Sequence, residues 1–398
     1  ENIMSSMCGI HFGHYKAAAA NDLLTSLHVA KFNLVLSSGV FLDRWCHSLM
    51  IFLQKEYGNI EFDKLRAVVL FEADFNWLQK IVFSGKMGNM AVTSGLIPQD
   101  QCAAPGKDGN EGTLLKRFHN NVLDTMHIPS ATVSADLDQC YDAVHHSVAA
   151  LGARSFGVPQ LVVGMMLSCI QSMALWIRTG YGISETPLQG TADNPFLSLL
   201  QGSGMGPWVF LSVSTLMVEG YKSLGHGCTY VSPLTSAVFA LAAILFVDDT
   251  DLLMRADSAS TEPEDFIEYV QQALTDWAGL VMASGGSLKQ SKSFAVIRTF
   301  NYASGKARMN RVRALPAETL TIPQRTGGDV TIPILDVDVA KKALGVWNPD
   351  NEYVNQIKVK GLSWVSKARN AGYVTTDDSW RSIMTQLRPK LNYGIVSV

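Results

Sequence analysis

The sequence predicts an α+β fold that contains both β-strands and helices. Two β-prone runs, 131–137 and 244–254, carry Asp residues at an end or at a turn, and the second is typical of a buried hairpin. The segment 261–285 begins with a capping box and continues with apolar residues at helical spacing. The apolar segments 161–173 and 208–221 predict two further helices.

The composition is that of a globular protein with a large core. The chain has 398 residues, of which 47% are hydrophobic and 17% charged, and this length allows two or three domains. Its six cysteines show no Cys-x-x-Cys spacing, which favours a reducing compartment, so we expect an intracellular protein, cytoplasmic or nuclear. The uncharged run 236–247 is shorter than the roughly 20 residues that span a bilayer, and no membrane partner is expected. Because the chain begins at Glu1 rather than Met, we expect a fragment of a longer protein.

Charge is distributed unevenly along the chain. The net charge is −3, but residues 286–398 hold 17 Lys and Arg against 8 Asp and Glu. Residues 1–285 hold the remaining 15 Lys and Arg against 27 acids. Such asymmetry predicts either a basic surface for a polyanion beside an acidic body or merely a solvated basic face.

The N-terminal part of the chain predicts helices followed by one strand. Ala-rich and Leu-rich stretches within 17–58 predict helices, the second of them over 41–54. The apolar run 65–71 predicts a strand. Glu72 and Asp74 then stand where acids favour the first turn of a helix.

The middle of the chain alternates loops and helices. The segment 103–112 predicts a loop, and it lacks the Gly-Lys-Ser/Thr of a P-loop. A helix is expected from 113 towards the strand that ends at Asp136, and a short one at 147–153. The Gly-rich segment 201–207 predicts either a helix entry turn or a loop that lies close to a ligand, since glycine leaves the backbone accessible.

The C-terminal part predicts strands and then a basic tail. Strands are expected at 293–300, 330–335 and 343–347. The tail, expected to be helical, carries Lys358, Lys360, Lys367, Arg369, Arg381, Arg388 and Lys390.

The acids of the two β-prone runs point to a cation. Asp248 and Asp249 stand between apolar runs, with no Lys or Arg after them until Arg255. Alone, such a pair is most simply a polar turn. Asp136 adds a third acid in a similar setting, and burying unpaired carboxylates costs several kcal/mol, so clustered acids imply a cation. All-oxygen ligands suit Mg²⁺ or Mn²⁺.

Three motifs, in this order, resemble the palm of a reverse transcriptase (an RNA-directed DNA polymerase) of the non-LTR retroelement and group II intron type. They are Asp-Leu-Asp-Gln-Cys-Tyr-Asp at 136–142, Gln-Gly-Ser-Gly-Met-Gly-Pro at 201–207 and Phe-Val-Asp-Asp at 246–249. Weaker similarities are the basic residues Arg66 and Lys80 and the segments 288–292 and 342–346. The chain departs from the family pattern at Leu200 (Pro in the family), Lys289 (Asn) and Ala343 (Tyr).

The resemblance implies a right-hand polymerase with fingers at 1–130 and a palm at 131–300, in which an antiparallel palm sheet packs on helices. The palm would include a helical finger-side excursion at about 150–195, and the palm end and a basic thumb would follow at 301–398. The implied activity is the addition of dNTPs to a primer 3′-hydroxyl by a two-metal mechanism, in a fragment of a retroelement polyprotein. The implied partners are an RNA template, a DNA primer and the RNA–DNA hybrid, and the basic C-terminal region would bind the duplex backbone.

The resemblance also implies roles for individual residues. Asp136, Asp248 and Asp249 would be catalytic, and Asp136, Asp248 and the Leu137 carbonyl would hold Mg²⁺ or Mn²⁺. The nucleotide-binding residues would be Lys64, Arg66, Tyr141, Gln201, Gly202 and Lys292. Among these, Tyr141 would pack beneath the incoming sugar; its alternative explanation is a core aromatic. Lys292 would act as a general acid.

Two alternatives remain open. An RNA-dependent RNA polymerase shares the palm and the paired Asp, but typically has Gly-Asp-Asp where this chain has Val247 before the acids. A catalytically inactive nucleic-acid-binding remnant is the other; the retained acids at 136, 248 and 249 argue against it.

Overall fold

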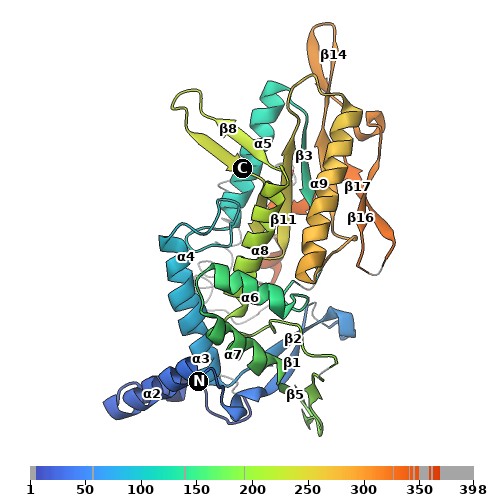
Figure 1. Ribbon diagram of the computed structural model, residues 1–398. Helices are drawn as coiled ribbons and strands as arrows, with labels where there is room; N and C mark the ends of the chain where they lie inside the picture. The colour runs from blue at the N-terminus through green and yellow to red at the C-terminus, as the bar shows by residue number, and fades with distance from the viewer. Residues whose placement is uncertain are drawn as a thin grey trace. The chain divides into compact units, whose positions relative to one another are not determined.

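The described part of the chain forms two compact units, each assembled from separate segments. The computed structural model describes residues 6–55, 58–138, 140–191, 193–325, 327–339, 341–343, 346–348, 358–359 and 362–367. The first unit combines 1–98, 139–216 and 284–286, and the second combines 99–138, 217–283 and 287–398. Both contain helices and strands, so the predicted mixture of α and β structure is confirmed (Figure 1). The division into fingers, palm and thumb stays a prediction.

The first unit is built around a small sheet. Its elements are α1 (Phe12–Ala18), α2 (Asp22–Ser38), the 3₁₀ turn Asp43–Cys46, β1 (His47–Gln54), the 3₁₀ turn Phe62–Lys64, β2 (Leu65–Leu70), α3 (Ala73–Gln79), the π-helix Lys80–Gly88, α4 (Asn89–Thr93), α6 (His146–Ser155), α7 (Gln160–Gln171), β5 (Ala174–Thr179), β6 (Gly182–Ile183), β7 (Leu188–Gln189) and the first turns of α8 (Gly206–Ser223). The strand order is β2-β1-β5-β6, with β7 also paired to β5.

The helix predicted over 41–54 is wrong, because β1 occupies most of this range. β1 pairs antiparallel with β2, with Leu49 opposite Leu70, and parallel with β5, with Leu49 opposite Trp176. A short apolar run does not by itself distinguish a buried strand from a buried helix. Here the run lies between two neighbouring strands, and the backbone hydrogen bonds on both sides decide its conformation.

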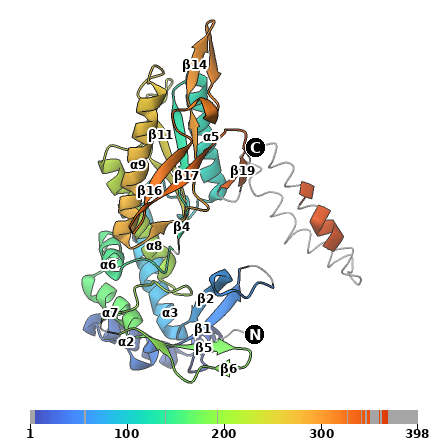
Figure 2. The same ribbon diagram turned by 90° about the vertical axis from the view of Figure 1, so that its right-hand side faces the viewer.

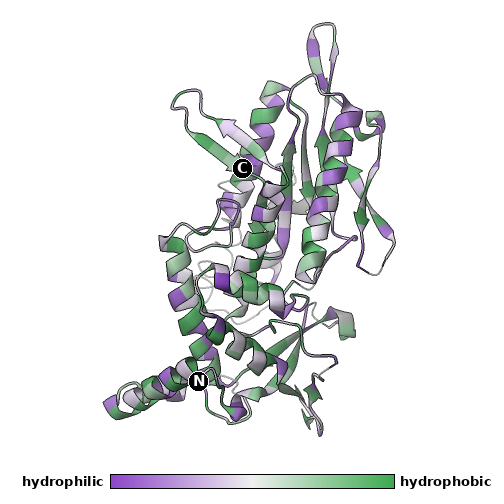
Figure 3. Cartoon of the chain, in the orientation of Figure 1, coloured by the Kyte–Doolittle hydropathy of each residue, from purple (hydrophilic) through white to green (hydrophobic). Residues whose placement is uncertain are grey.

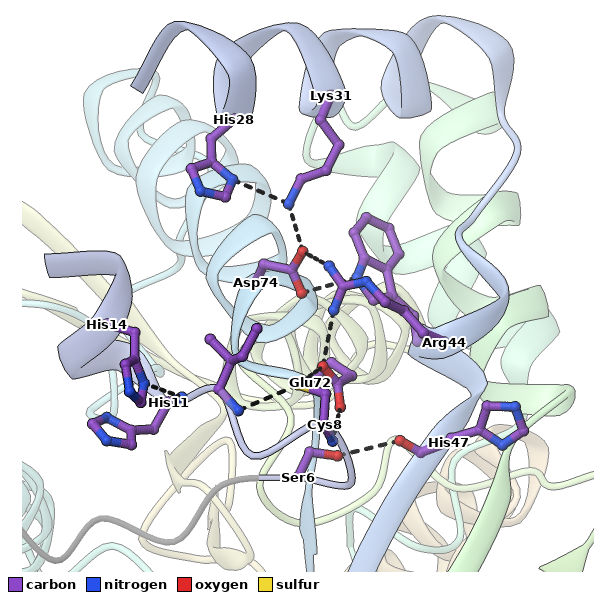
Figure 4. A network of polar contacts seen from close by, with 12 residues as sticks. Ser6, Cys8, His11, His14, His28, Lys31, Arg44, His47, Glu72 and Asp74 are labelled. Carbon is purple, nitrogen blue, oxygen red and sulfur yellow. Dashed lines mark hydrogen bonds and ion pairs between the residues drawn. The ribbon is translucent and has the colours of Figure 1, made fainter. Parts of the chain in front are cut away.

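A buried ionic network holds the N-terminal helices against the start of α3 (Figure 4). The side chains of Glu72 and Asp74 are 1% and 0% exposed. Lys31 Nζ lies 2.6 Å from Asp74 Oδ2, Arg44 Nη1 lies 2.9 Å from Glu72 Oε2, and Arg44 also pairs with Asp74. Trp45 donates a further hydrogen bond of 3.0 Å to Asp74 Oδ1. The two acids predicted for the first turn of this helix therefore also anchor α2 and the segment before β1.

The second unit is built around a sheet of six strands. Its elements are α5 (Gly109–Met126), β3 (Ser130–Ser134), β4 (Leu137–Asp138), the last turns of α8, β8 (Cys228–Val231), β9 (Val238–Leu241), β10 (Ala243–Phe246), β11 (Asp249–Arg255), α9 (Pro263–Ser284), β12 (Ser287–Leu288), β13 (Phe294–Arg298), β14 (Phe300–Ala303), β15 (Lys306–Met309), the 3₁₀ turn Val312–Ala314, β16 (Thr319–Pro323), β17 (Asp329–Leu335), β18 (Lys341–Ala343) and β19 (Val346–Asn348). The strand order is β10-β11-β3-β13-β17-β16.

The large sheet is antiparallel except at one position. The pairs β10–β11, β11–β3, β3–β13 and β16–β17 are antiparallel, whereas β13 and β17 are parallel. The expected antiparallel sheet is therefore corrected to a mixed one, because the chain leaves β13 through a long excursion and returns in the same direction. The smaller pairs β4–β12, β8–β9, β14–β15 and β18–β19 complete the unit (Figure 2).

The predicted apolar face of α9 is confirmed as core. Phe266, Val270, Ala273, Trp277 and Val281 are all at most 1% exposed. The Trp277 ring meets Tyr221 of α8 edge-on, with the ring centroids 5.5 Å apart. Hydrophilic and hydrophobic residues alternate along α9 in Figure 3, as expected of an amphipathic helix.

Some predictions fall partly beyond the described residues. The strand predicted at 343–347 is instead a β18–β19 pair, and residues 344–345 lie outside the described part. In the basic tail Lys360, Arg369, Arg381, Arg388 and Lys390 also lie outside it. All six cysteines carry free thiols. Within the described ranges, no helix combines the length and the apolar character needed to cross a membrane.

Candidate active site

Asp136 lies where β3 leaves the centre of the large sheet. After β3 ends, Ala135 N–H donates to Thr250 O at 2.8 Å and Leu137 N–H to Asp248 O at 3.3 Å. The chain thus continues beside the tip of the β10–β11 hairpin for three residues past the strand. These backbone bonds bring the upstream acid to the paired acids, although the sequence separates them by more than a hundred residues.

The hairpin turns through Val247 and Asp248. Phe246 pairs with Asp249, so only two residues form the loop. Val247 has a φ of 59°, and a positive φ at the first loop residue is what primed hairpin turns require. This conformation is uncommon and strained for a β-branched residue. It leaves Asp248 exposed at the tip and makes Asp249 the first residue of β11.

The register places Asp136 directly across from Asp249. β11 pairs with β3 so that Asp251 faces Ser134, and the two backbone bonds past the strand keep this register. Residues opposite one another on antiparallel strands point to the same face, with Cβ atoms about 5 Å apart. Asp136 and Asp249 therefore share one face at the end of the sheet, beside the loop that carries Asp248.

The crowding of these acids alters their protonation. Burial and the charges of Asp248, Asp136 and Asp251 raise the pKa of Asp249 to about 6. Burial also raises the pKa of Asp136, where the charge of Lys292 opposes the rise and that of Asp248 adds to it. The pKa values of Asp136 and Asp249 thus both respond to neighbouring acids, as expected where like charges meet in a partly buried site.

Two lysines and a serine complete the surroundings of Asp136. Lys292 Nζ lies 3.3 Å from Asp136 Oδ2, with the lysine side chain 58% exposed and the aspartate 13%. Lys289 N–H donates to Asp136 O at 2.8 Å, and its Nζ lies 3.3 Å from Asp138 Oδ1. Asp136 N–H donates to Ser293 Oγ at 3.2 Å. The backbone of Asp136 is thereby fixed while its carboxylate faces an exposed cation.

Asp100 supports the other edge of the hairpin, a role that sequence reasoning missed. Its side chain is buried, and Oδ1 accepts hydrogen bonds from Ala242 N at 2.8 Å and Ala243 N at 3.0 Å. Its Oδ2 lies 2.6 Å from Lys222 Nζ. Leu245 N–H donates to Asp100 O, and Cys102 N–H donates to Leu245 O, both at 2.8 Å. No motif marks this residue; its role depends on a contact across more than 140 residues.

Asp251 shows that an acid on the same strand can be purely structural. Its side chain is 2% exposed and lies 2.9 Å from Lys116 Nζ of α5. Asp251 lies only two residues from the crowded Asp249 on the same face of β11, yet it has a lysine partner.

The donor set fits a hydrated magnesium or manganese ion better than a closed protein cage. Among the described residues, no three His, Cys, Asp or Glu side chains gather as a ready-made metal site. Mg²⁺ usually keeps several waters and takes one or two carboxylates together with substrate phosphates. Asp136, Asp248 and the Leu137 carbonyl supply oxygen donors of this kind, and the raised pKa of Asp136 indicates negative charge that lacks full compensation.

Gln201 and Gly202 belong to the first unit, where they pack against β2. Val69 N–H donates to Gln201 O at 2.7 Å, and Asn76 Nδ2 donates to Gly202 O at 3.0 Å. Gly202 has a φ of 108°, and a Cβ there would lie 2.2 Å from Val69 O. The close approach that requires glycine is therefore made to β2. A contact of this turn with template or base stays a prediction.

The remaining predicted nucleotide-binding residues of the first unit lie against α8 or at β2. Tyr141 is half-buried, with its ring 5.4 Å from that of Phe210 on α8, as the core-aromatic alternative expects. Arg66 is exposed on β2, and Lys64 is half-buried just before it. Of the nucleotide-binding predictions, only Lys292 belongs to the second unit with the three acids. Gln139, inside the first motif, lies outside the described residues.

Comparisons with known proteins found similarity to solved structures alone, at low sequence identity. No protein-family model matches, and no curated protein matches. Among solved structures, it is similar to apo telomerase from Candida tropicalis truncated from its C-terminal domain, with a TM-score of 0.44 and 11% identity, over 80% of this chain and 60% of that one. It is also similar to Candida tropicalis telomerase in complex with a fragment of telomeric RNA, with a TM-score of 0.43 and 10% identity, over 69% of this chain and 44% of that one. Similarity at this level carries no argument about activity.

Proposed function

We propose that this chain is an RNA-directed DNA polymerase, which adds dNTPs to a primer 3′-hydroxyl and forms part of a retroelement polyprotein. The observation that supports it is the meeting of Asp136 with the Asp248–Asp249 hairpin at one end of the large sheet. The three acids come from two motifs distant in sequence, and the pKa of Asp249 is raised to about 6 by burial and by the other acids. A site that concentrates negative charge in this way is suited to bind cations.

The chemistry follows from the residues that face one another. Asp136 and Asp248, with the Leu137 carbonyl, would hold Mg²⁺ or Mn²⁺, and Asp249 would support them. When bound, two such ions activate an attacking hydroxyl and stabilise the leaving oxygen of a phosphoryl transfer. Lys292, whose Nζ already lies 3.3 Å from Asp136 Oδ2, would move to the triphosphate and give a proton to the leaving pyrophosphate.

The other contacts belong to the same proposal. Arg66 and Lys64 would pair with the triphosphate, Tyr141 would lie beneath the sugar, and the Gln201–Gly202 turn would face template or base. The positively charged region 286–398 would bind the backbone of the RNA–DNA hybrid.

Primer extension on an RNA template tests the proposal. We expect the chain to extend a DNA primer with dNTPs in Mg²⁺ or Mn²⁺, and Asp248→Asn to lower the rate about 100-fold or more, because a charged metal ligand is lost. Asp265→Asn, the same change at an exposed position on α9, should leave the rate unchanged. Equal extension by wild type and Asp248→Asn would remove the assigned site.

The choice of nucleotide separates the related activities. Extension with rNTPs in preference to dNTPs would make the chain an RNA-dependent RNA polymerase. Binding of primer–template without extension in either metal would make it a non-catalytic nucleic-acid-binding protein.

A further inference from the structure

The β14–β15 hairpin projects beyond the end of the large sheet in both views (Figures 1 and 2). Its strands pair from Phe300 opposite Met309 to Ala303 opposite Lys306. The two loop residues, Ser304 and Gly305, have φ values of 54° and 73°, as a tight primed turn requires. It is therefore a regular element and not an irregular loop.

Its base is fixed to the body of the second unit. Asn310 closes the hairpin with two hydrogen bonds to Thr299, from N to O at 2.8 Å and from Nδ2 to Oγ1 at 2.9 Å. The preceding Arg298 is buried, 3.0 Å from Asn120 Oδ1 and 3.6 Å from Asp124 Oδ1 on α5. The tip is thus presented from a rigid base.

The hairpin and its flanks carry only positive charge. Residues 294–317 contain five Lys and Arg residues and no Asp or Glu. One of them is the buried Arg298, and the exposed ones are Lys306, Arg308, Arg311 and Arg313. Arg311 pairs with Asp338 at 2.7 Å, whereas the structure shows no ion pair for Lys306 or Arg308 within the described ranges. Two exposed cations that show no ion pair within the described ranges favour an anionic ligand.

Alternation along the two strands separates this charge from an aromatic face. Arg308 lies opposite Asn301, and Lys306 lies opposite Ala303, so both cations share one face. Phe300 and Tyr302 occupy the other. Tyr302 is 58% exposed, and its ring lies 6.4 Å from that of His127 at the end of α5. Single-stranded nucleic acids bind where bases stack on an exposed ring and phosphates meet cations. A strand that crosses the edge of this narrow two-stranded ribbon would reach the ring on one face and the cations on the other.

This surface lies away from the three acids. β13 runs antiparallel to β3, so its first residue, Phe294, pairs with Ser134 near Asp136, and its last, Arg298, pairs with Ser130 at the opposite end. At about 3.3 Å per residue, the hairpin begins about 20 Å from the acids along the strand. A ligand held there does not contact the reacting atoms.

We propose that the β14–β15 hairpin binds single-stranded RNA at a site separate from the three acids. Lys306 and Arg308 contact phosphates, and Tyr302 stacks on an unpaired base. The choice of RNA among polyanions rests on the proposed function, since a chain that copies RNA must retain unpaired template outside its catalytic centre.

Charge reversal tests the phosphate contacts. The full-length double variant K306E/R308E should bind a 20-nucleotide unstructured RNA roughly tenfold more weakly or worse in 0.1 M salt. The slope of log affinity against log salt should fall by about 1.4, the value for two phosphate contacts on a single strand. The matched control K16E/R154E makes the same charge change at exposed positions of the first unit and should retain the wild-type slope. An unchanged affinity and slope for K306E/R308E would overturn the proposal.

Substitution of the ring tests the identity of the ligand. Tyr302→Ala should weaken RNA binding about 5- to 150-fold through lost stacking, while Tyr302→Phe should bind like wild type. Polyglutamate is the comparison ligand, because an acidic protein offers charge without bases. If K306E/R308E lowers binding of polyglutamate and RNA equally and Tyr302→Ala changes neither, the hairpin is a general polyanion site and the proposal fails. A loss confined to a double-stranded hybrid would overturn it too.

The extension assay keeps this proposal distinct from the proposed function. Asp248→Asn, which is expected to lose extension, should keep the wild-type affinity and salt slope for the 20-nucleotide RNA, because the acids lie far from the hairpin. RNA affinity is measured without nucleotides, so it reports on the hairpin even if no extension occurs. Conversely, full extension by a variant that has lost RNA affinity leaves the catalytic assignment intact.

Discussion

Two clusters of acidic residues in this molecule differ in how their negative charge is compensated. In the first unit, Glu72 and Asp74 are almost fully buried, and Arg44 pairs with both. In the second, Asp136, Asp248 and Asp249 lie together, and the lysine on Asp136 is 58% exposed. The first cluster has a strong cation for each buried acid, whereas the second has more acids than buried cations.

The pKa shifts follow this difference. Burial alone would raise the pKa of Asp74, but the hydrogen bonds and charges of Lys31 and Arg44 outweigh it and hold the pKa below its usual value. Burial and neighbouring acids instead raise the pKa of Asp249 to about 6. Hence each acid of the first cluster has a cationic partner, while an added cation would offset the like charges of the second. This contrast is the reason for proposing the second cluster as the functional one.

Removing a cation from the complete cluster should have the largest effect on stability. Arg44→Met leaves two buried carboxylates short of a partner, and we expect the free energy of unfolding to fall by about 3 kcal/mol. Urea titration monitored by tryptophan fluorescence measures it. The matched change Lys292→Met removes a cation that is itself 58% exposed, and its cost should stay below about 1 kcal/mol. Similar losses for both variants would mean that the two clusters do not differ as described.

The complete cluster should also respond to acid in a defined direction. Because the pKa of Asp74 is lowered on folding, the unfolded chain binds a proton at higher pH than the folded chain does. The stabilisation is therefore fully present above the ordinary Asp pKa of about 4 and is lost as pH falls through the lower folded value. Thermal melts between pH 6 and 3 should show a steeper loss for wild type than for Asp74→Asn. Parallel curves would contradict this assignment.

Secondary structure could be predicted wherever the apolar residues followed a clear helical or strand pattern. The apolar face of α9 and the β10–β11 hairpin follow from spacing alone, and both are confirmed. β1 could not be predicted, because its apolar run is compatible with either helix or strand until β2 and β5 supply partners. The parallel β13–β17 pair likewise depends on a return of the chain that no local pattern encodes.

Only those residues of the candidate site that belong to sequence motifs could be predicted. Asp136, Asp248 and Asp249 were identified from sequence, and the structure brings them together in one unit. Two further acids beside the site have lysine partners that depend on distant contacts: Lys222 pairs with Asp100 and Lys116 with Asp251. Such partners become visible only after folding. The roles of the first-unit residues predicted to bind nucleotide stay predictions.

The smallest expected effect contrasts two acids of a single strand. In metal-free buffer, Asp249→Asn removes one of three like charges, so the melting temperature should stay equal or rise by about 1–3 °C, which corresponds to less than about 1 kcal/mol. Asp251→Asn, two residues along β11, instead loses its 2.9 Å pair with Lys116 in a buried position and should lower the melting temperature. Both substitutions exchange the same atoms, so size and helix or strand propensity cancel. A fall for Asp249→Asn as large as that for Asp251→Asn would show that the crowded acid is held by a partner of its own, and the distinction between a complete and an incomplete cluster would be lost.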